Sequence, residues 1–192
     1  MPNEDSITRC VWAGNDLAMR DYHDIEWGVP VHEDRVLFEF LCLEGAQAGL
    51  SWSTILSRRA NYRKAFDNFN PLKMSRYSDV KKSVLLNDAG IIRNRLKVEA
   101  FISNAMAYLD IQKKYGSLDK YLWGFVKGRH LNTSDQAKAE EIGVSMSKDL
   151  KRHGFRFVGP TICYAFMQAT GMINDHETSC FRYAEIEKDF AR

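Results

Sequence analysis

One acidic residue constrains this chain more than any other, because it lies on the apolar face of an expected helix. Glu44 follows Phe40 by four residues and Leu37 by seven, so its side chain should point inward with theirs. A buried carboxylate needs a hydrogen-bond partner or a positive charge, or else it takes up a proton. The helix is therefore expected to place Glu44 against a partner or in a pocket.

A glycine turn and a tryptophan follow this helix at once. Gly49 should end the helix, and Trp52 comes three residues later. A carboxylate and an indole on either side of a turn suit a pocket for a flat, partly cationic ring. The alternative is structural: Glu44 pairs with a buried arginine while Trp52 packs in the core, and such ion pairs are common. The spacing leaves both interpretations open.

Composition limits the class of protein. The chain has 192 residues, of which 45% are hydrophobic, enough to bury a sizeable core in one unit or two small lobes. No run approaches the roughly 18 apolar residues of a membrane span, and the first residues lack the apolar stretch of a secretory signal. We therefore expect a cytoplasmic protein with reduced cysteines and no membrane association. A net charge of +2 means that a nucleic-acid partner would need a local basic patch.

Helical periodicity recurs along the chain, and no stretch shows the alternation of a strand. The helix with Glu44 should begin at a cap on Asp34. Further helices are predicted after a cap at Ser53, over 78–87, 93–114 and 118–126, with 127–143 as a polar surface connection. The economical prediction is an all-α fold that forms a single domain over residues 1–192.

Two glycines flank a short apolar segment between the last predicted helices. A helix ending at 151–153 is followed by Gly154, and Pro160 opens the next helix. Backbone N–H groups of such a hairpin and of the following helix can bind phosphate, with Arg156 as a nearby cation. This pattern predicts a helix-hairpin-helix that contacts DNA; the alternative is an ordinary tight corner. A second basic cluster, more typical of a solvated face, comprises Arg93, Arg95 and Lys97.

Each end of the chain carries one cysteine and one histidine. His176 and Cys180 are four residues apart, so both reach the same side of a helical turn. Together with Cys10 and His23 they make a closed set of two cysteines and two histidines, the set that holds structural zinc. The alternative is plain burial, because free cysteine is among the most buried residues. The cysteines expected in the core are Cys42 and Cys163.

Four stretches, taken in order, resemble the 3-methyladenine DNA glycosylase I family within the helix-hairpin-helix glycosylase superfamily. They are Tyr22-His23-Asp24 with Glu26-Trp27-Gly28, Cys42 through Trp52, Gly90 through Arg93, and Gly154 through Ala169. The resemblance covers about residues 9–180 and leaves the extra residues before Cys10 and the tail after Cys180 without a counterpart.

The resemblance implies a role for particular residues. The base pocket would contain Glu44 as the catalytic carboxylate and, as substrate-binding residues, Tyr22, Trp52 and Trp12. Leu50 resembles the residue that enters the base stack, and the other expected DNA contacts are Gln47, Arg156 and Gly159. One structural zinc ion per chain would be held by Cys10, His23, His176 and Cys180.

One departure concerns the catalytic carboxylate. Many members of the wider superfamily use an aspartate downstream of the hairpin, but no acidic residue occurs between Pro160 and Asn174. Asp175 adjoins an expected zinc ligand, and we assign it no catalytic role.

The function implied is hydrolysis of the N-glycosidic bond of 3-methyladenine in alkylated duplex DNA. Free 3-methyladenine and an abasic site would be the products, and a monomer is expected. The methylated base is a cationic leaving group, so the protein must chiefly extrude and select it. The alternative is a non-catalytic helix-hairpin-helix DNA-binding module, which would not need Glu44 beside Trp52. Zinc-dependent hydrolysis is disfavoured, because four protein ligands leave no position for water.

Overall fold

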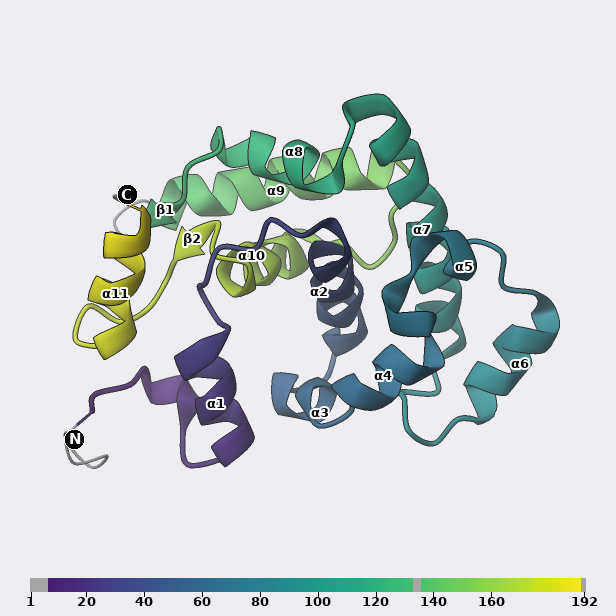
Figure 1. The fold of residues 1–192 in the computed structure, drawn as a ribbon, viewed down its shortest axis with the longest axis horizontal. Coiled ribbons are helices and arrows are strands. Elements are labelled where there is room, and N and C mark those ends of the chain that lie inside the picture. Colours follow the sequence, from purple (N-terminus) through teal and green to yellow (C-terminus); the bar gives the residue numbers. More distant parts are fainter. Residues whose placement is uncertain (1–6, 133–135, 191–192) are drawn as a thin grey trace.

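Helix α2 (Asp34–Gln47) runs through the middle of the molecule, with helices on either side of it (Figure 1). The computed structural model describes residues 7–132 and 136–190. All residues of α2 from Leu37 to Ala46 are buried. The helix contacts α3, α7, α8 and α10, so its apolar residues form the centre of the hydrophobic core.

Helices make up most of the described residues, which confirms the predicted helical class. The α-helices around α2 are α1 (Leu17–Ile25), α3 (Trp52–Leu56), α4 (Arg59–Ala65), α5 (Pro71–Met74), α6 (Asp79–Asn87), α7 (Arg95–Tyr115), α8 (Leu118–Trp123), α9 (Gln136–Arg152), α10 (Pro160–Ala169) and α11 (Phe181–Phe190). Short 3-10 turns are η2 (Val11–Ala13), η3 (Asp67–Phe69) and η4 (Gly124–Val126).

The start of α2 differs from the prediction in its capping residue. Glu33, not Asp34, accepts hydrogen bonds from the first free N–H groups of the helix. The Asp34 carboxylate instead accepts from the backbone N–H groups of Leu118 and Asp119 and from the hydroxyl of Tyr108. Asp34 therefore ties the first turn of α8 to the first turn of α2.

Three other predictions need correction. The helix expected after Ser53 is divided into α3, α4 and η3, with Ser51 as its cap and a left-handed backbone at Asn68 (φ 53°). The polar segment 127–143 contains the first half of α9, whose buried Ala139, Gly143, Met146 and Leu150 recur at helical spacing. Two short parallel strands, β1 (Leu131–Asn132) and β2 (Ile173–Asn174), also occur.

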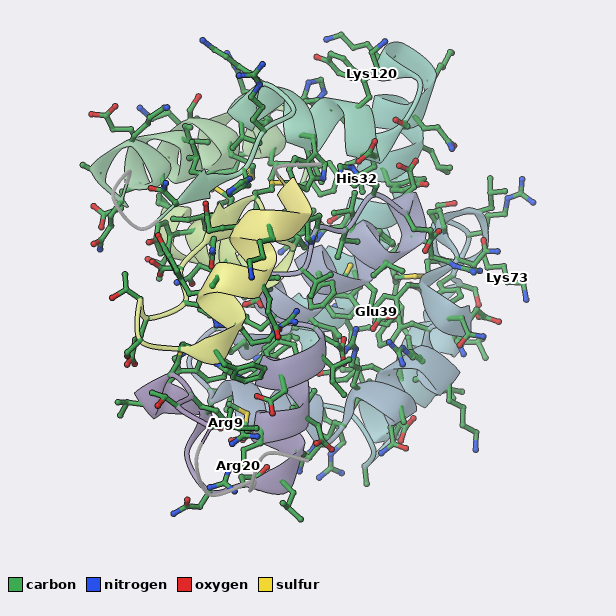
Figure 2. All side chains as sticks on the ribbon, turned by 60° about the vertical axis from the view of Figure 1, so that its left-hand side comes forward. Arg9, Arg20, His32, Glu39, Lys73 and Lys120 are labelled. Carbon is green, nitrogen blue, oxygen red and sulfur yellow. The ribbon has the colours of Figure 1, made fainter. Side chains whose placement is uncertain are left out.

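The chain after α10 passes close to the segment that follows α1. Gly171 has φ +72°, and a Cβ there would lie 2.5 Å from the backbone nitrogen of Pro30, so only glycine fits. The backbone N–H of Phe181 donates to the carbonyl of Thr8 at 3.0 Å. The N-terminal segment and α11 thus lie on the same side of the molecule (Figures 1 and 2).

A buried ion-pair network links α2 to α4. Arg59 donates to Glu39 and to Glu26, each at 2.5 Å, and Arg63 donates to both oxygens of Glu39. Figure 2 shows Glu39 inside the molecule, whereas Lys73 and Lys120 extend from its surface. Within the described ranges, no helix has the length and apolar character needed to cross a membrane.

Candidate functional site

A cavity of about 250 Å³ lies between α1, α2, α3 and α10. Its lining residues come from two parts of the chain, residues 12–52 and 165–175: Trp12, Met19, Tyr22, Trp27, Glu44, Gln47, Trp52, Ala165, Gln168 and Asp175. All four residues predicted to form the base pocket, and Gln47, therefore line one cavity.

Glu44 lies in the wall of this cavity without a counter-charge. Glu44 is 3% exposed, and among the residues that the structure describes its Oε2 has no hydrogen-bond partner. Burial raises the pKa of Glu44 to about 8. The buried arginine that could have neutralised it, Arg59, pairs with Glu39 and Glu26 instead. The structural ion pair considered from the sequence is therefore not formed by Glu44 within the described residues.

Aromatic rings form much of the rest of the wall. The rings of Tyr22 and Trp52 lie 5.3 Å apart between centroids, and those of Trp12 and Trp27 lie 4.8 Å apart. Like Glu44 Oε2, the indole Nε1 of Trp52 is buried and has no hydrogen-bond partner within residues 7–132 and 136–190. Burial, with the nearby Glu44, raises the pKa of Tyr22 well above its usual value, so the phenol stays neutral. Trp12 is 39% exposed and lies nearest to solvent.

These atoms define what the cavity can bind. A buried indole N–H and a buried carboxyl oxygen both lack partners, and each such group costs free energy until a ligand satisfies it. The flat rings around them suit a planar heterocycle, and a positive charge on that heterocycle would favour the ionised form of Glu44.

The turn after α2 presents Leu50 outside the cavity. Gly49 takes φ +78° and reverses the chain, and the backbone N–H of Leu50 donates to the carbonyl of Gln47 at 2.6 Å. Leu50 is 40% exposed, so it projects beside the cavity that Gln47 lines. Ser51 then caps α3 and positions Trp52 at its first residue.

Several cavity residues were given no role from the sequence. Trp27 lies in the stretch Glu26-Trp27-Gly28 that carries the resemblance, and no sequence pattern points to Met19. Ala165 and Gln168 are three residues apart on α10, a spacing that places them on one face. Asp175 accepts a hydrogen bond from Gln168 Nε2 at 2.5 Å and a longer one from the hydroxyl of Tyr164 at 3.4 Å.

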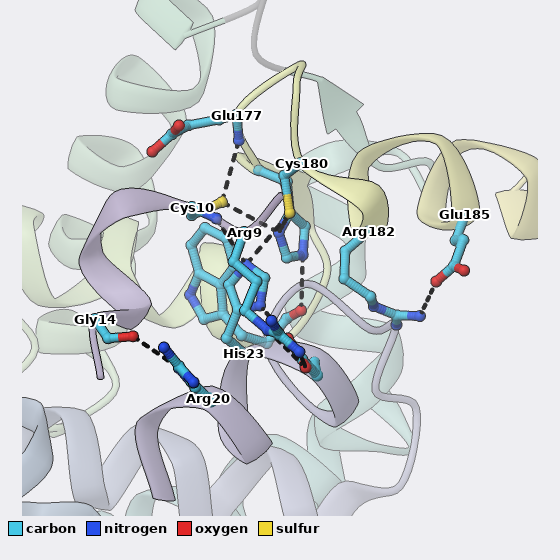
Figure 3. Close-up of polar contacts among 12 residues, drawn as sticks. Arg9, Cys10, Gly14, Arg20, His23, Glu177, Cys180, Arg182 and Glu185 are labelled. Carbon is cyan, nitrogen blue, oxygen red and sulfur yellow. Dashed lines mark hydrogen bonds and ion pairs between the residues drawn. The ribbon is translucent and has the colours of Figure 1, made fainter. Parts of the chain in front are cut away.

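The two cysteines and two histidines form one buried cluster behind the cavity (Figure 3). Their ligand atoms all lie within 4.8 Å of one another. His23 Nε2 is 3.4 Å from Cys180 Sγ, and His176 Nδ1 is 3.5 Å from Cys10 Sγ. The sequence prediction that both chain ends meet at this set is confirmed.

The surroundings of the cluster favour metal binding. In each histidine, the ring nitrogen that does not face the cysteines has another polar contact. His23 Nδ1 lies 2.7 Å from Asp24 Oδ1, and His176 Nε2 lies 3.1 Å from the carbonyl oxygen of Trp27. Such contacts orient the other ring nitrogen toward a metal. Burial raises the pKa of Cys10 to about 12 and lowers that of His176 to about 4, so the charged thiolate form needs a cation beside it. The cluster can therefore hold a metal ion.

The segment between α9 and α10, where the sequence predicts a hairpin, is hydrogen-bonded through its backbone to side chains of α7 and α9. Asn104 Oδ1 accepts from the Arg156 N–H at 2.7 Å, and Ser147 Oγ donates to the carbonyl of Val158 at 2.6 Å. A Cβ on Gly159 would meet no atom within 4 Å, so the backbone there is open to an approaching group. Arg156 is half-exposed, and its nearest carboxylate, Glu99, is 4.0 Å away.

The predicted basic cluster of Arg93, Arg95 and Lys97 does not form a continuous basic surface. Arg95 pairs with Glu99 at 2.9 Å, whereas Lys97 is buried against backbone carbonyls. Cys42 and Cys163 are buried in the core, as predicted.

Comparison with known proteins identifies relatives over nearly the whole chain. The family model described as methyladenine glycosylase matches residues 12–183. DNA-3-methyladenine glycosylase 1 of Escherichia coli (strain K12) is 44% identical over 182 residues, which cover 92% of this chain and 97% of that protein. A crystal structure of 3-methyladenine DNA glycosylase I superimposes with a TM-score of 0.86 at 45% identity, covering 91% of this chain and 98% of the other.

A second solved structure carries a ligand. It is a variant of 3-methyladenine DNA glycosylase I in complex with 3-methyladenine, 34% identical, with a TM-score of 0.85 and coverage of 90% of this chain and 96% of that one. Because the family model matches residues 12–183 and these relatives cover nine tenths of the chain or more, this protein belongs to the methyladenine glycosylase family.

Proposed function

We propose that this protein is a DNA-3-methyladenine glycosylase of base-excision repair, which removes 3-methyladenine from alkylated duplex DNA. The observation that carries the proposal is the cavity in which Glu44 Oε2 and Trp52 Nε1 are both buried without partners. The relative from Escherichia coli carries this activity in its name, and a related glycosylase has been solved with 3-methyladenine bound.

The reaction is hydrolysis without strand cleavage. Water adds to the C1′ carbon and releases one proton to solvent, while the N-glycosidic bond breaks and the base leaves with the electron pair of that bond. This electron pair neutralises the positive charge of the methylated base, which makes the base a good leaving group. The protein therefore contributes mainly by extruding the nucleotide and by selecting the damaged base.

Selection follows from the charge of the lesion. The rings of Trp52, Tyr22 and Trp12 attract a cationic purine more strongly than neutral adenine. Glu44, ionised beside that cation, adds a charge-assisted hydrogen bond. Glu44 is thus the catalytic carboxylate, and the three aromatic residues bind the substrate base.

Four residues outside the aromatic wall contact the duplex. Leu50, exposed on the turn after α2, enters the base stack, and Gln47 lies beside it at the cavity. Arg156 and Gly159 in the hairpin face the phosphates, where an exposed guanidinium and an open backbone N–H can bind. The hairpin and α9 and α10 on either side of it act as the helix-hairpin-helix motif.

The metal cluster holds one structural zinc ion per chain. Two cysteines and two histidines match the preference of zinc, and four protein ligands leave no open position for catalytic water. The ligands are Cys10, His23, His176 and Cys180. We further infer that the protein acts in the cytoplasm as a monomer and that residues 1–192 form a single catalytic domain.

Base release from methylated DNA tests the function directly. Wild-type protein incubated with methylated duplex should release 3-methyladenine, identified by chromatography, and leave abasic sites. Glu44→Gln should lower the single-turnover rate by roughly ten- to a hundredfold, because a hydrogen bond to a charged group is worth about 1.5 to 3 kcal/mol. Trp52→Ala tests stacking, and Glu141→Gln, an exposed carboxylate of α9, is the matched control. Duplex binding without any released base would favour the non-catalytic DNA-binding module.

A further inference from the structure

Helix α7 carries two buried polar side chains that the proposed chemistry does not use. Lys97 is 7% exposed, and Asn104 is also buried. They are seven residues apart, about two helical turns, so they lie on the same face of α7. Each one bonds to the backbone of a different segment that the proposed function places against DNA.

Lys97 holds the turn after α2. Its Nζ donates to the carbonyl of Ala46 at 2.6 Å and to that of Ala48 at 2.8 Å. Carbonyl groups at a helix C-terminus lack intrahelical donors, so the ammonium supplies what the end of α2 needs. The residues held in this way include Gln47 at the cavity and lead directly to the exposed Leu50.

Asn104 holds the hairpin. Its Nδ2 donates to the carbonyl of Arg156 at 3.1 Å, and its Oδ1 accepts from the N–H of the same residue at 2.7 Å. Both backbone groups of Arg156 are therefore fixed by one side chain. The hairpin also packs on α2, because a Cβ on Gly45 would lie 3.1 Å from both Cβ and the carbonyl oxygen of Phe157.

Base extrusion depends on the distance between the turn that carries Leu50 and the hairpin that carries Arg156. Leu50 has to enter the stack while the hairpin remains on the phosphates, so both must fit the duplex at the same time. A displacement of about 1 Å in a positioned group can cost a hundredfold in rate. Lys97 and Asn104 lie on one face of a single helix. Their hydrogen bonds therefore fix the distance between the turn after α2 and the hairpin before DNA binds.

We propose that α7 is the positioning element for DNA engagement, with Lys97 holding the Leu50 turn and Asn104 holding the hairpin. Neither residue is among those lining the cavity, so both act through the segments they hold. The inference rests on the proposed function, because it assigns how that same site meets the duplex.

Substituting Lys97 should affect base extrusion, whereas substituting Asn104 should affect duplex binding. Lys97→Met keeps the length of the side chain and removes the ammonium. It should lower the single-turnover rate about tenfold or more for 3-methyladenine paired in duplex, with little change in duplex affinity. The loss should be about threefold or less when the lesion lies opposite an abasic site, because an unpaired base needs less extrusion. Asn104→Leu should instead raise the dissociation constant for damaged and undamaged duplex alike.

Two control variants separate positioning from general stability. Lys113→Met removes the same charge from an exposed position of α7 and should change neither measurement. Ile111→Val removes a buried methyl group from the same helix. It should lower stability and leave the hydrogen bonds of Lys97 and Asn104 in place. Its rates on paired and unpaired lesions should stay in the wild-type ratio.

The results discriminate between the possible failures. An equal loss on paired and unpaired lesions for Lys97→Met, or a loss that follows melting temperature as in Ile111→Val, would overturn the inference. If Lys97→Met does not fold, Lys97→Gln keeps amide donors but loses the charge and is one atom too short to bond both carbonyls, so it should still lower the paired-to-unpaired rate ratio; an unchanged ratio would also overturn the inference. A wild-type protein that releases no base would instead refute the proposed function.

Discussion

A carboxyl group in an apolar wall ties the protonation of Glu44 to the stability of the fold. Burial raises its pKa to about 8 from a usual value of 4.5. Between those values the unfolded chain loses this proton while the folded protein keeps it, so the free energy of unfolding falls as pH rises. Below the lower value and above the upper one, both states hold the same number of protons and the dependence ends.

Glu44→Gln should remove this pH dependence. Relative to the mutant, the wild type should lose on the order of 1 kcal/mol of unfolding free energy per pH unit, between about pH 5 and about pH 8. Denaturant unfolding at several pH values measures the difference. Glu141→Gln, on the exposed side of α9, should leave the slope unchanged. Parallel curves for wild type and Glu44→Gln would mean that the carboxyl is already ionised in the folded protein.

The direction of Glu44 was predictable from sequence, but its isolation was not. Helical spacing from Leu37 and Phe40 shows where the side chain points. It cannot show that Arg59, at the start of α4, pairs with Glu39 and Glu26 rather than with Glu44. Partners across elements depend on packing angles that periodicity does not contain.

The hairpin between α9 and α10 gives a test at the scale of elements. A Cβ at Gly159 meets no protein atom within 4 Å and the backbone there has φ −64°, so Gly159→Ala should fold normally. Its methyl group would obstruct a phosphate at the backbone, and affinity for damaged and undamaged duplex should fall together. Arg156→Ala should also reduce the salt dependence of binding by about one ion. Gly124→Ala, equally open but in η4, is the matched control and should bind DNA normally.

The turn after α2 should behave differently from the hairpin. Leu50→Ala removes an exposed side chain, so the free energy of unfolding should change little. Excision from duplex should fall while affinity for free 3-methyladenine, measured by calorimetry, is preserved, because only extrusion requires a wedge. Equal losses for duplex and free base would contradict the assignment of Leu50.

Elements with local signals were predicted better than elements without them. Gly154 and Pro160 marked the end of α9 and the start of α10. The first half of α9 was missed because its apolar stripe contains small residues, Ala139 and Gly143, among many charged ones. Strand β1 has two residues and exists only because Ile173 lies beside Leu131, which no local pattern can reveal.

At the scale of the whole molecule, the metal cluster and the cavity share a wall. Trp27 lines the cavity, and its ring lies 4.6 Å from that of His176 between centroids. Trp12 also packs against Trp27, with ring centroids 4.8 Å apart, and follows Cys10 by two residues. The residue types and spacing made Cys10, His23, His176 and Cys180 a candidate set but left plain burial as the alternative, because contacts between distant segments leave no periodic trace; the family resemblance then favoured the closed set.

The metal prediction follows from this shared wall. Purified protein should contain one zinc ion per chain by elemental analysis, and Cys180→Ser or His23→Ala should remove it. Both variants should melt at clearly lower temperature, because structural zinc can contribute on the order of 10 kcal/mol to a folded unit. Cys163→Ser, a core cysteine outside the cluster, should keep its zinc. Preference for the methylated base should survive in whatever fraction stays folded, since Glu44 and Trp52 belong to the core side of the cavity. A metal-free preparation with full activity and unchanged melting would contradict the assignment, and would leave the four side chains as a buried polar contact between the chain ends.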